Sequence, residues 1–299
     1  MLPINNAELI LNERGAIYHL NLKPNEVAPN VILVGDPDRV ASVSAYFDNI
    51  TYKGSHREFI THTGLLEGTL LSVISTGIGT DNIDIVLNEL DALYNISFET
   101  KTVNHTPISL HIIRLGTAGS LDANIAPGDV VISQMAFGFD ALANYYPPIL
   151  NDPLAQTFSQ FWQNQTYLPV KPYCVSADSS LLNWFSKELD KTIKVGITAS
   201  CSGFYAPQGR KLRLPPLITN LPEYLSELNP LGQSILNFEM ETSGIYLLSH
   251  LLGHKAISLS AILANRPKGT FSLTPEQDID HLIKWALSKF AYFCKETNS

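Results

Sequence analysis

Short apolar runs bounded by glycine-containing turns recur through the first half of the chain. They cover residues 31–34, 70–75, 112–115 and 130–132. In each run the apolar residues are consecutive and do not alternate with polar ones, a pattern typical of strands that are buried on both faces. Gly35, Gly77 and Gly116 closely follow the first three runs, so we expect each of these strands to end in a turn.

Helical patterns lie between and after these runs. Residues 82–94 place apolar side chains on one stripe, and Asp81 stands where an N-cap is expected. Residues 274–277, Thr-Pro-Glu-Gln, form a capping-box pattern with proline at the first helical position, and an amphipathic stretch follows. Strands that alternate with helices predict an α/β sandwich around a largely buried sheet.

Two polar, proline-containing stretches, Pro147–Asn164 and Leu212–Gly232, separate the predicted elements of the second half. We expect long surface or lid-like connections there, because unstructured connections of this length are often functional. No internal repeat or low-complexity linker divides the chain, so we expect a single domain over residues 1–299.

Composition narrows the class of partner. The 299 residues are 45% hydrophobic and 16% charged, and 20 Lys and Arg against 28 Asp and Glu give a net charge of −8. Such a chain lacks the broad basic face that binds nucleic acid or an anionic membrane, so a small molecule is the expected ligand. Residues 1–15 are too polar for a signal sequence and no long apolar run follows, which predicts a cytoplasmic protein without a membrane span. Its three cysteines are widely spaced, and we expect them to be reduced and buried.

Three arginines stand near the ends of predicted strands. They lie in the segments Gly35-Asp-Pro-Asp-Arg39, Ser55-His-Arg57-Glu-Phe59 and Arg114-Leu-Gly-Thr117. Glycine lets backbone N–H groups approach an oxyanion, threonine adds a hydroxyl, and arginine supplies a forked cation suited to phosphate. Because ligands of α/β sheets bind beyond the carboxyl ends of strands, these segments predict a compact anion site.

Simpler interpretations apply to two of the three arginine segments. Gly-Asp-Pro-Asp is also a common turn sequence, and Arg57 between His56 and Glu58 can form an exposed ion pair of little energetic value. Arg114 is harder to explain in this way, because an arginine inside an apolar strand must be paired or face a cleft.

Two later clusters carry polar groups of another kind. The segment Phe204-Tyr-Ala-Pro-Gln208-Gly-Arg210 combines an aromatic face, an amide and a guanidinium, which suits a flat heterocycle with carbonyl and N–H edges. The segment Asn237-Phe-Glu239-Met240-Glu241 places two carboxylates at a predicted strand-to-helix junction, where they can accept hydrogen bonds from a diol. A negatively charged first helical turn is the alternative interpretation of this glutamate pair.

In their order along the chain, these segments resemble the nucleoside phosphorylase family, and within it the uridine phosphorylase branch most closely. The resemblance extends from about Tyr18 to Arg266. It rests on His19, Gly35–Arg39, Ser55–Phe59, Ser75–Gly79, Arg114–Thr117, Phe204–Arg210 and Glu239–Glu241. It implies a single-domain, three-layer αβα sandwich with a central mixed β-sheet.

The resemblance also implies roles for individual residues. Phosphate would be held by Gly35, Arg39, Arg57, Arg114 and Thr117. Ribose would be held by His19, Glu239, Met240 and Glu241. The base would be held by Phe204, Gln208, Arg210 and Arg266. Catalysis would rest on Arg39, Arg114, Gln208, Arg210 and Glu241. His19 and Arg57 would come from a neighbouring subunit, so a homo-oligomer is expected, either a dimer or a hexamer.

The activity implied by the resemblance is phosphorolysis of uridine, a pentosyl transfer with inorganic phosphate as co-substrate and no cofactor. Purine-cleaving relatives generally protonate the leaving base with an aspartate in the late strand-end loop, whereas residues 258–274 contain no acidic residue here. Uracil is therefore the expected base. The alternatives are a purine nucleoside phosphorylase of the same family, a hydrolytic nucleosidase, and a catalytically silent nucleoside-binding protein.

Two departures from the family pattern concern ions. After Gly79 the family usually has a Gly/Thr-Pro-Ser turn, whereas this chain has Thr80-Asp81-Asn82. The carboxylate of Asp81 therefore either caps the helix or faces the phosphate. Relatives with a potassium site between subunits use a Glu, an Ile carbonyl and a Ser, which match Glu58, Ile78 and Asn82. The change to asparagine makes potassium an optional ligand at most.

Overall fold

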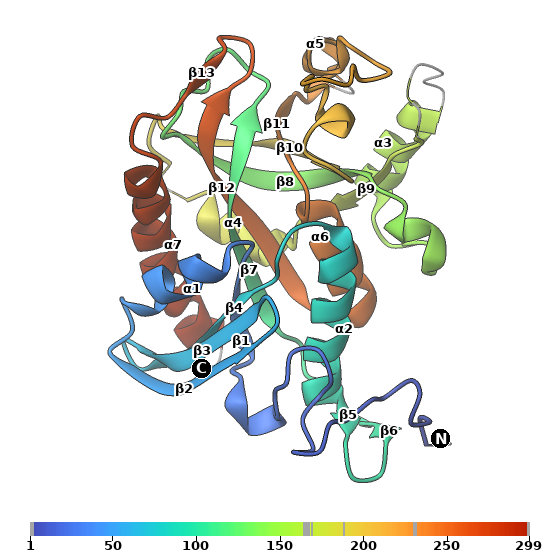
Figure 1. Cartoon of the computed structure of the whole chain (residues 1–299), viewed down its shortest axis with the longest axis vertical. Coiled ribbons are helices and arrows are strands. Elements are labelled where there is room, and N and C mark those ends of the chain that lie inside the picture. The colour runs from blue at the N-terminus through green and yellow to red at the C-terminus, as the bar shows by residue number, and fades with distance from the viewer. Residues whose placement is uncertain (1–2, 164–167, 169, 188, 230–231, 298–299) are drawn as a thin grey trace.

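A mixed sheet of eleven strands runs through the computed structural model, which describes residues 3–163, 168, 170–187, 189–229 and 232–297 (Figure 1). Its strands are β1 (Asn30–Val34), β2 (Asn49–His56), β3 (Phe59–Leu66), β4 (Thr69–Ser75), β7 (His111–Ser120), β8 (Val130–Phe139), β9 (Tyr173–Ser176), β10 (Ile193–Cys201), β11 (Ile235–Glu239), β12 (Lys255–Asn265) and β13 (Thr270–Phe271). A separate hairpin consists of β5 (Ile96–Ser97) and β6 (Thr102–Val103). The predicted α/β architecture with a central mixed sheet is confirmed.

The apolar runs form the buried parallel centre of this sheet. β1 pairs in parallel with β4 on one side and with β7 on the other, and all five of its residues are buried. The runs at residues 31–34 and 70–75 end as strands where the sequence predicted. β7 is much longer than predicted because Gly116–Ser120 pairs along β12 in place of forming a turn, and β8 is longer because Met135–Phe139 pairs along β10.

The second half of the sheet curves back on itself. β12 pairs in parallel with β7 and antiparallel with β8, and β8 continues through β10 and β11 back to β7. β7, β12, β8, β10 and β11 therefore form a closed ring of strands, which the sequence did not predict. This closure places the end of β7 beside β11 in an antiparallel pairing, with Gly119 opposite Phe238.

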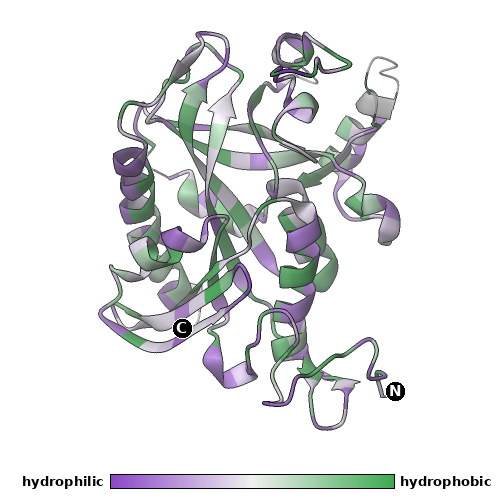
Figure 2. Ribbon diagram, viewed as in Figure 1, coloured by the Kyte–Doolittle hydropathy of each residue, from purple (hydrophilic) through white to green (hydrophobic). Residues whose placement is uncertain are grey.

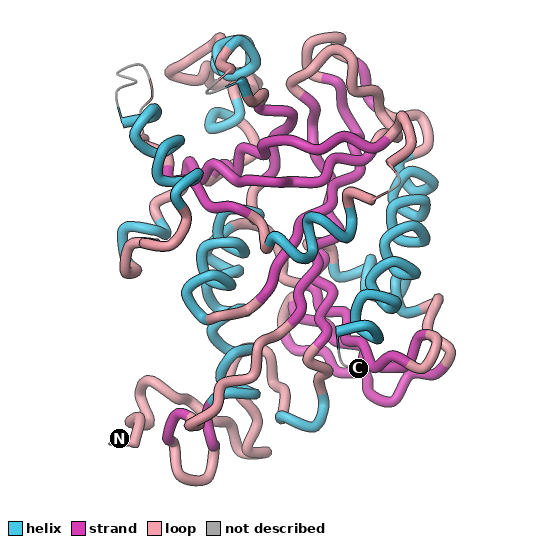
Figure 3. The backbone as a smooth tube through the Cα atoms, turned by 180° about the vertical axis from the view of Figure 1, so that it is seen from behind, coloured by secondary structure: helices cyan, strands magenta, loops and turns pink. Residues whose placement is uncertain are grey.

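Helices cover the sheet from two sides. The α-helices are α1 (Pro37–Ser44), α2 (Thr80–Asn95), α3 (Pro153–Gln163), α4 (Ser179–Phe185), α5 (Leu221–Glu227), α6 (Thr242–Leu252) and α7 (Pro275–Thr297). The 3-10 turns η1 (Pro24–Glu26), η2 (Leu142–Tyr145) and η3 (Ala206–Gln208) lie in the connections between these elements. α7 lies on one side of the central strands, and α2 packs against α6 on the other (Figures 1 and 3).

The two predicted helices exist, with one change at their ends. α2 buries the expected stripe, and Figure 2 shows hydrophobic and hydrophilic residues side by side along it. Its N-cap is Gly79 and not Asp81, which lies exposed in the first turn. α7 begins at Pro275 as predicted, and the hydroxyl of Ser272 accepts from the N–H of Thr274 and donates to Asp278 at this end.

The two expected connections contain helices that the sequence analysis did not predict. α3 occupies part of Pro147–Asn164, and α5 occupies part of Leu212–Gly232, where Leu221 and Leu225 are buried. Asn164 and residues 230–231 lie outside the described residues. No helix in the described part of the chain combines the length and apolar composition needed to cross a membrane.

Candidate active site

A cleft of ≈ 780 Å³ opens where the carboxyl ends of several strands meet. Its lining comes from the segments after β1 and β4, from β7 and β12, from the η3 segment and from the β11–α6 junction. The predicted site residues that line it are Gly35, Arg39, Arg114, Thr117, Phe204, Gln208, Arg210, Glu239, Met240 and Glu241. Predicted residues from four segments that are distant in sequence are therefore brought into one cavity.

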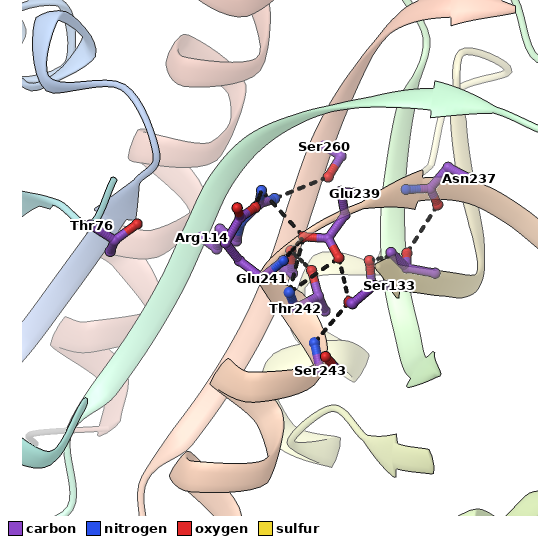
Figure 4. A network of polar contacts seen from close by, with 12 residues as sticks. Thr76, Arg114, Ser133, Asn237, Glu239, Glu241, Thr242, Ser243 and Ser260 are labelled. Atoms are coloured by element: carbon purple, nitrogen blue, oxygen red, sulfur yellow. Dashed lines mark hydrogen bonds and ion pairs between the residues drawn. The ribbon is translucent and has the colours of Figure 1, made fainter. Parts of the chain in front are cut away.

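Arg114 occupies the centre of this cleft and is only 4% exposed (Figure 4). Its Nη2 contacts a carboxylate oxygen of Glu241 and lies 3.2 Å from Oε2 of Glu239. Burial opposes the charge of this guanidinium, but the two carboxylates outweigh that effect and raise the pKa of Arg114. The arginine in the apolar strand is thus both paired and directed into the cleft.

Gly116 makes room for this side chain. A Cβ atom at residue 116 would lie 1.8 Å from Nη1 of Arg114, so no larger residue fits while the guanidinium keeps its position. The glycine after Arg114 therefore serves the packing of the arginine and not the turn that the sequence analysis expected.

Arg39 supplies a second cation at the same end of the cleft. It stands in the first turn of α1, and its Nη1 donates to the backbone carbonyl of Leu115 at 3.2 Å. Within the described part of the chain it makes no ion pair, and burial together with the nearby Arg114 lowers its pKa. A guanidinium in this state is stabilised when an anion binds beside it. Gly35 and Thr117 line the same region.

The opposite end of the cleft carries the aromatic and amide groups. The guanidinium carbon of Arg210 lies 3.7 Å from the centre of the Phe204 ring, and Nη1 donates to the Phe204 carbonyl at 2.8 Å. The same nitrogen donates to Oε1 of the buried Gln208. Burial and the neighbouring Arg266 lower the pKa of Arg210 to about 10, so this end also favours an anion.

Arg266 lies next to the segment that carries Gln208 but does not line the cleft. Its Nη1 donates to the backbone carbonyl of Gln208 at 3.2 Å, which ties the end of β12 to the η3 segment. Arg266 therefore contacts the segment predicted to hold the base without facing the cleft itself.

The β11–α6 junction presents the two glutamates between these ends. Glu239 closes β11, and Glu241 is the N-cap residue of α6. Oε1 of Glu241 accepts from the backbone N–H of Gly79 at 2.8 Å, so the start of α2 is attached to the start of α6. Burial raises the pKa of Glu241 despite its contact with Arg114.

His19 and Arg57 do not line the cleft of their own chain. The ring of His19 meets Tyr18 edge to face at 4.9 Å and contacts Glu89 through Nδ1 at 2.6 Å. Arg57 lies over the same Tyr18 ring, with its guanidinium carbon 5.6 Å from the ring centre. The two residues therefore share one surface with Tyr18, outside the cavity.

The residues matched to a potassium site lie at the cleft, and two of them contact each other. Nδ2 of Asn82 donates to Oε1 of Glu58 at 3.3 Å, so an amide N–H points at the carboxylate that would bind the ion. Ile78 lines the same region and is 70% exposed. Asp81 does not line the cleft and is exposed, so its carboxylate does not face the anion-binding end.

The structure adds lining residues that sequence reasoning missed. Phe271, from the short strand β13, and Leu263 and Ala264, from the end of β12, form an apolar wall. No motif marks them, because their place depends on the antiparallel pairing of β13 with β12. Phe238, Asp36 and Gly119 also line the cleft beside the predicted segments.

The fold and this cleft agree with comparisons to known proteins. The profile of the Phosphorylase superfamily matches residues 29–295, and the chain belongs to this family. It is 31% identical over 275 residues to the uridine phosphorylase of Thermococcus kodakarensis, covering 91% of this chain and 86% of that protein. Its identity to the uridine phosphorylase of Escherichia coli is 27% over 273 residues, covering 90% and 94%.

A solved structure is similar over nearly the whole chain. The Trypanosoma brucei nucleoside phosphorylase, described as showing uridine phosphorylase activity, superposes with a TM-score of 0.88 at 29% sequence identity. The match covers 95% of this chain and 100% of that one. The family resemblance predicted from the ordered motifs is thereby confirmed.

Proposed function

We propose that this protein is a pentosyltransferase that converts uridine and phosphate to uracil and ribose 1-phosphate in nucleoside salvage. The observation that carries the proposal is that one cleft is lined by the guanidinium groups of Arg39, Arg114 and Arg210 and by the carboxylates of Glu239 and Glu241. The uridine phosphorylases that match this chain over about nine-tenths of its length support the same reaction.

At the anion-binding end, phosphate would contact the backbone N–H of Gly35, the guanidinium groups of Arg39 and Arg114, and the hydroxyl of Thr117. Arg114 already gives Nη2 to the glutamates and directs Nη1 toward Ser260 at 3.4 Å. Its remaining N–H groups are available to the phosphate oxygens, as are those of Arg39 beyond its bond to Leu115, since Arg39 forms no ion pair among the described residues.

Ribose would lie between the two ends, with its hydroxyls donating to Glu241 and its ring close to Met240. A phosphate oxygen then bonds to the anomeric carbon as the bond from that carbon to N1 of uracil breaks. The electron pair of the broken bond stays on the base. The ribose carries positive charge in the transition state, which phosphate and Glu241 stabilise electrostatically.

The base end would receive the negative charge that leaves with uracil. Oε1 of Gln208 accepts from Arg210, which leaves the amide NH₂ free to donate to a carbonyl oxygen. Arg210 donates to another carbonyl oxygen, and Phe204 covers the ring. A donor that acts on developing charge in this way typically contributes about 100- to 1,000-fold in turnover.

This arrangement favours a pyrimidine over a purine. Residues 258–274 provide no carboxylic acid to protonate a leaving purine, and both Gln208 and Arg210 are donors to carbonyl oxygens. Inosine would consequently be the poorer substrate.

We also propose that the working form is a homo-oligomer in which His19 and Arg57 complete the neighbouring subunit's site. Both residues lie outside the cleft of their own chain and share one surface with Tyr18. Arg57 would reach the neighbour's phosphate, and His19 would bond the 5′-hydroxyl of its ribose. The unit would be a dimer or a ring of dimers built from one domain per chain, residues 1–299.

Phosphate is the co-substrate in this proposal, and no cofactor takes part. Potassium is an optional ligand in this proposal, since Asn82 stands where relatives have serine and its amide donates to Glu58. The acidic composition, with a net charge of −8, fits a cytoplasmic enzyme of small molecules that binds neither nucleic acid nor membranes.

The test is to incubate the purified protein with uridine or inosine, with and without phosphate, and to follow the free base by chromatography. We expect uracil only when phosphate is present, and slower release of hypoxanthine. Release of uracil without phosphate would indicate a nucleosidase. Thermal stabilisation by uridine without any turnover would indicate a silent binding protein.

A further inference from the structure

The carboxylate of Glu239 is fully engaged by the protein itself. Oε1 accepts from the hydroxyl of Ser200, and Oε2 accepts from the backbone N–H of Glu241 at 3.0 Å. The N–H of Thr242 lies 2.9 Å from Oε2, and Nη2 of Arg114 lies 3.2 Å from the same oxygen. The N–H of Thr242 also lies 3.1 Å from Oε1, so three hydrogen-bond donors and the ion pair with Arg114 surround a carboxylate that offers about four lone-pair sites.

Glu241 differs in this respect although it stands two residues away. Its carboxylate receives the N–H of Gly79 and one contact from Arg114. Two of its about four lone-pair sites therefore stay open on the side of the cleft. Only Glu241 of the pair has acceptor capacity left for a ribose diol.

The donors to Glu239 are themselves held in place. Ser200, in β10, accepts from the backbone N–H of Ser243 at 2.9 Å while its hydroxyl donates to Glu239. The hydroxyl of Ser243 donates to Asp140 at 2.8 Å, and Tyr173 donates to the same carboxylate at 3.0 Å. Figure 4 shows Glu239 between Arg114 on one side and Thr242 and Ser243 on the other.

We propose that Glu239 is a positioning residue and not a ribose ligand, and that Ser200 orients it. Glu239 holds the backbone of the Met240–Thr242 turn and fixes Nη2 of Arg114 between two carboxylates. The turn aims Glu241 at the sugar, and the fixed Nη2 leaves the other N–H groups of Arg114 directed at phosphate. This inference rests on the proposed function and replaces the ribose-binding role that the resemblance implied for Glu239.

The inference is tested with uridine, 2′-deoxyuridine and 3′-deoxyuridine as substrates of Glu239→Gln and Glu241→Gln. Loss of a buried hydrogen bond to a charged group predicts that Glu239→Gln lowers kcat/KM about 10- to 100-fold. The loss is expected to be the same for the three sugars within about twofold, as for independent sites. For Glu241→Gln, we expect a smaller loss of kcat/KM with the deoxy sugar that lacks the hydroxyl bound by Glu241.

A loss in Glu239→Gln that shrinks with one deoxy sugar would show a direct contact with ribose and overturn the inference. An unchanged kcat/KM with only a lowered Tm would reduce Glu239 to a structural residue and also overturn it. The wild-type protein is assayed first, so a failure of uridine phosphorolysis itself is recognised separately.

Ser200→Ala provides a second test that does not alter the buried charge. Removal of the Ser200 hydroxyl predicts a rise of about 3- to 10-fold in the KM for phosphate, because Glu239 loses one hydrogen bond and then holds Arg114 less firmly. The matched control is Ser133→Ala. Ser133 is equally buried, and its hydroxyl pairs with Thr198 at 2.5 Å without touching Glu239. If both alanine variants lower only the Tm, or raise the KM for phosphate equally, the inference is wrong.

Discussion

The guanidinium of Arg114 fills the space that a side chain at Gly116 would take, with Nη1 1.8 Å from where a Cβ would stand. Two residues on the same face of β7 thus share one position, and the smaller one permits the larger one to fold back into the cleft. The combination of an arginine and a glycine two residues later is therefore a packing requirement of the anion-binding end.

Gly116→Ala is expected to displace Arg114 and to raise the KM for phosphate while lowering kcat about 100- to 1,000-fold, the usual loss for a displaced charge-stabilising donor. Steady-state kinetics with phosphate as the varied substrate measures this. The control is Gly119→Ala in the same strand, where a Cβ would be 3.6 Å from Arg210. There we expect a change in the KM for uridine and little change in that for phosphate. Equal phosphate defects in both variants would contradict the packing argument.

Arg210→Ala is expected to lower kcat for uridine about 100- to 1,000-fold, because the departing uracil then loses its main cation. The loss should be smaller for a nucleoside whose base is a better leaving group, such as 5-fluorouridine. Arg213→Ala is the matched control, since Arg213 is exposed and does not line the cleft. An Arg210→Ala enzyme with unchanged kcat would remove the base end from the proposed mechanism.

Two inactive variants should complement each other when their subunits mix. Arg57→Ala changes the surface that we propose to complete the neighbour's site, whereas Arg39→Ala changes the cleft of its own chain. In a dimer with sites shared between subunits, random mixing at equal amounts restores about a quarter of the sites. The assay is activity after joint unfolding and refolding, with each variant refolded alone as the control. No recovery in the mixture, or an active monomer by light scattering, would contradict shared sites.

The three cysteines, Cys174, Cys201 and Cys294, are free and buried. Burial raises the pKa of Cys174 and of Cys294 to about 12, and it raises that of Cys201 as well. Since the thiolate is the reactive form, we expect the native protein at pH 8 to react very slowly with a thiol-specific reagent. The denatured protein should titrate all three thiols rapidly. Fast labelling of even one thiol in the native protein would show that it is accessible.

Local patterns predicted the elements whose physical cause is local. The consecutive apolar residues of 31–34 become a strand because both neighbours in the sheet are parallel and bury it completely. Residues 82–94 become a helix because their apolar stripe faces α6. Asp81 was misjudged as the cap because the chain turns at Gly79, whose φ of 94° only glycine adopts easily.

Features that depend on distant contacts were not predictable in this way. The strand β7 continues past Gly116 only because β12, about 140 residues later, pairs along it. Phe271 reaches the cleft because β13 pairs antiparallel with β12. In the site, motif order identified the residues of the cleft, but the full set of donors around Glu239 depends on Ser200, which no motif contained.

The most direct measurement is the identity and amount of the sugar product when the enzyme acts on uridine in phosphate buffer. Phosphorus NMR with parallel chromatography of the base measures both products in one reaction. We predict one equivalent of ribose 1-phosphate for each equivalent of uracil, and no reaction when phosphate is left out. Free ribose in place of the phosphate ester, or no uracil at any phosphate concentration, would contradict the proposed reaction.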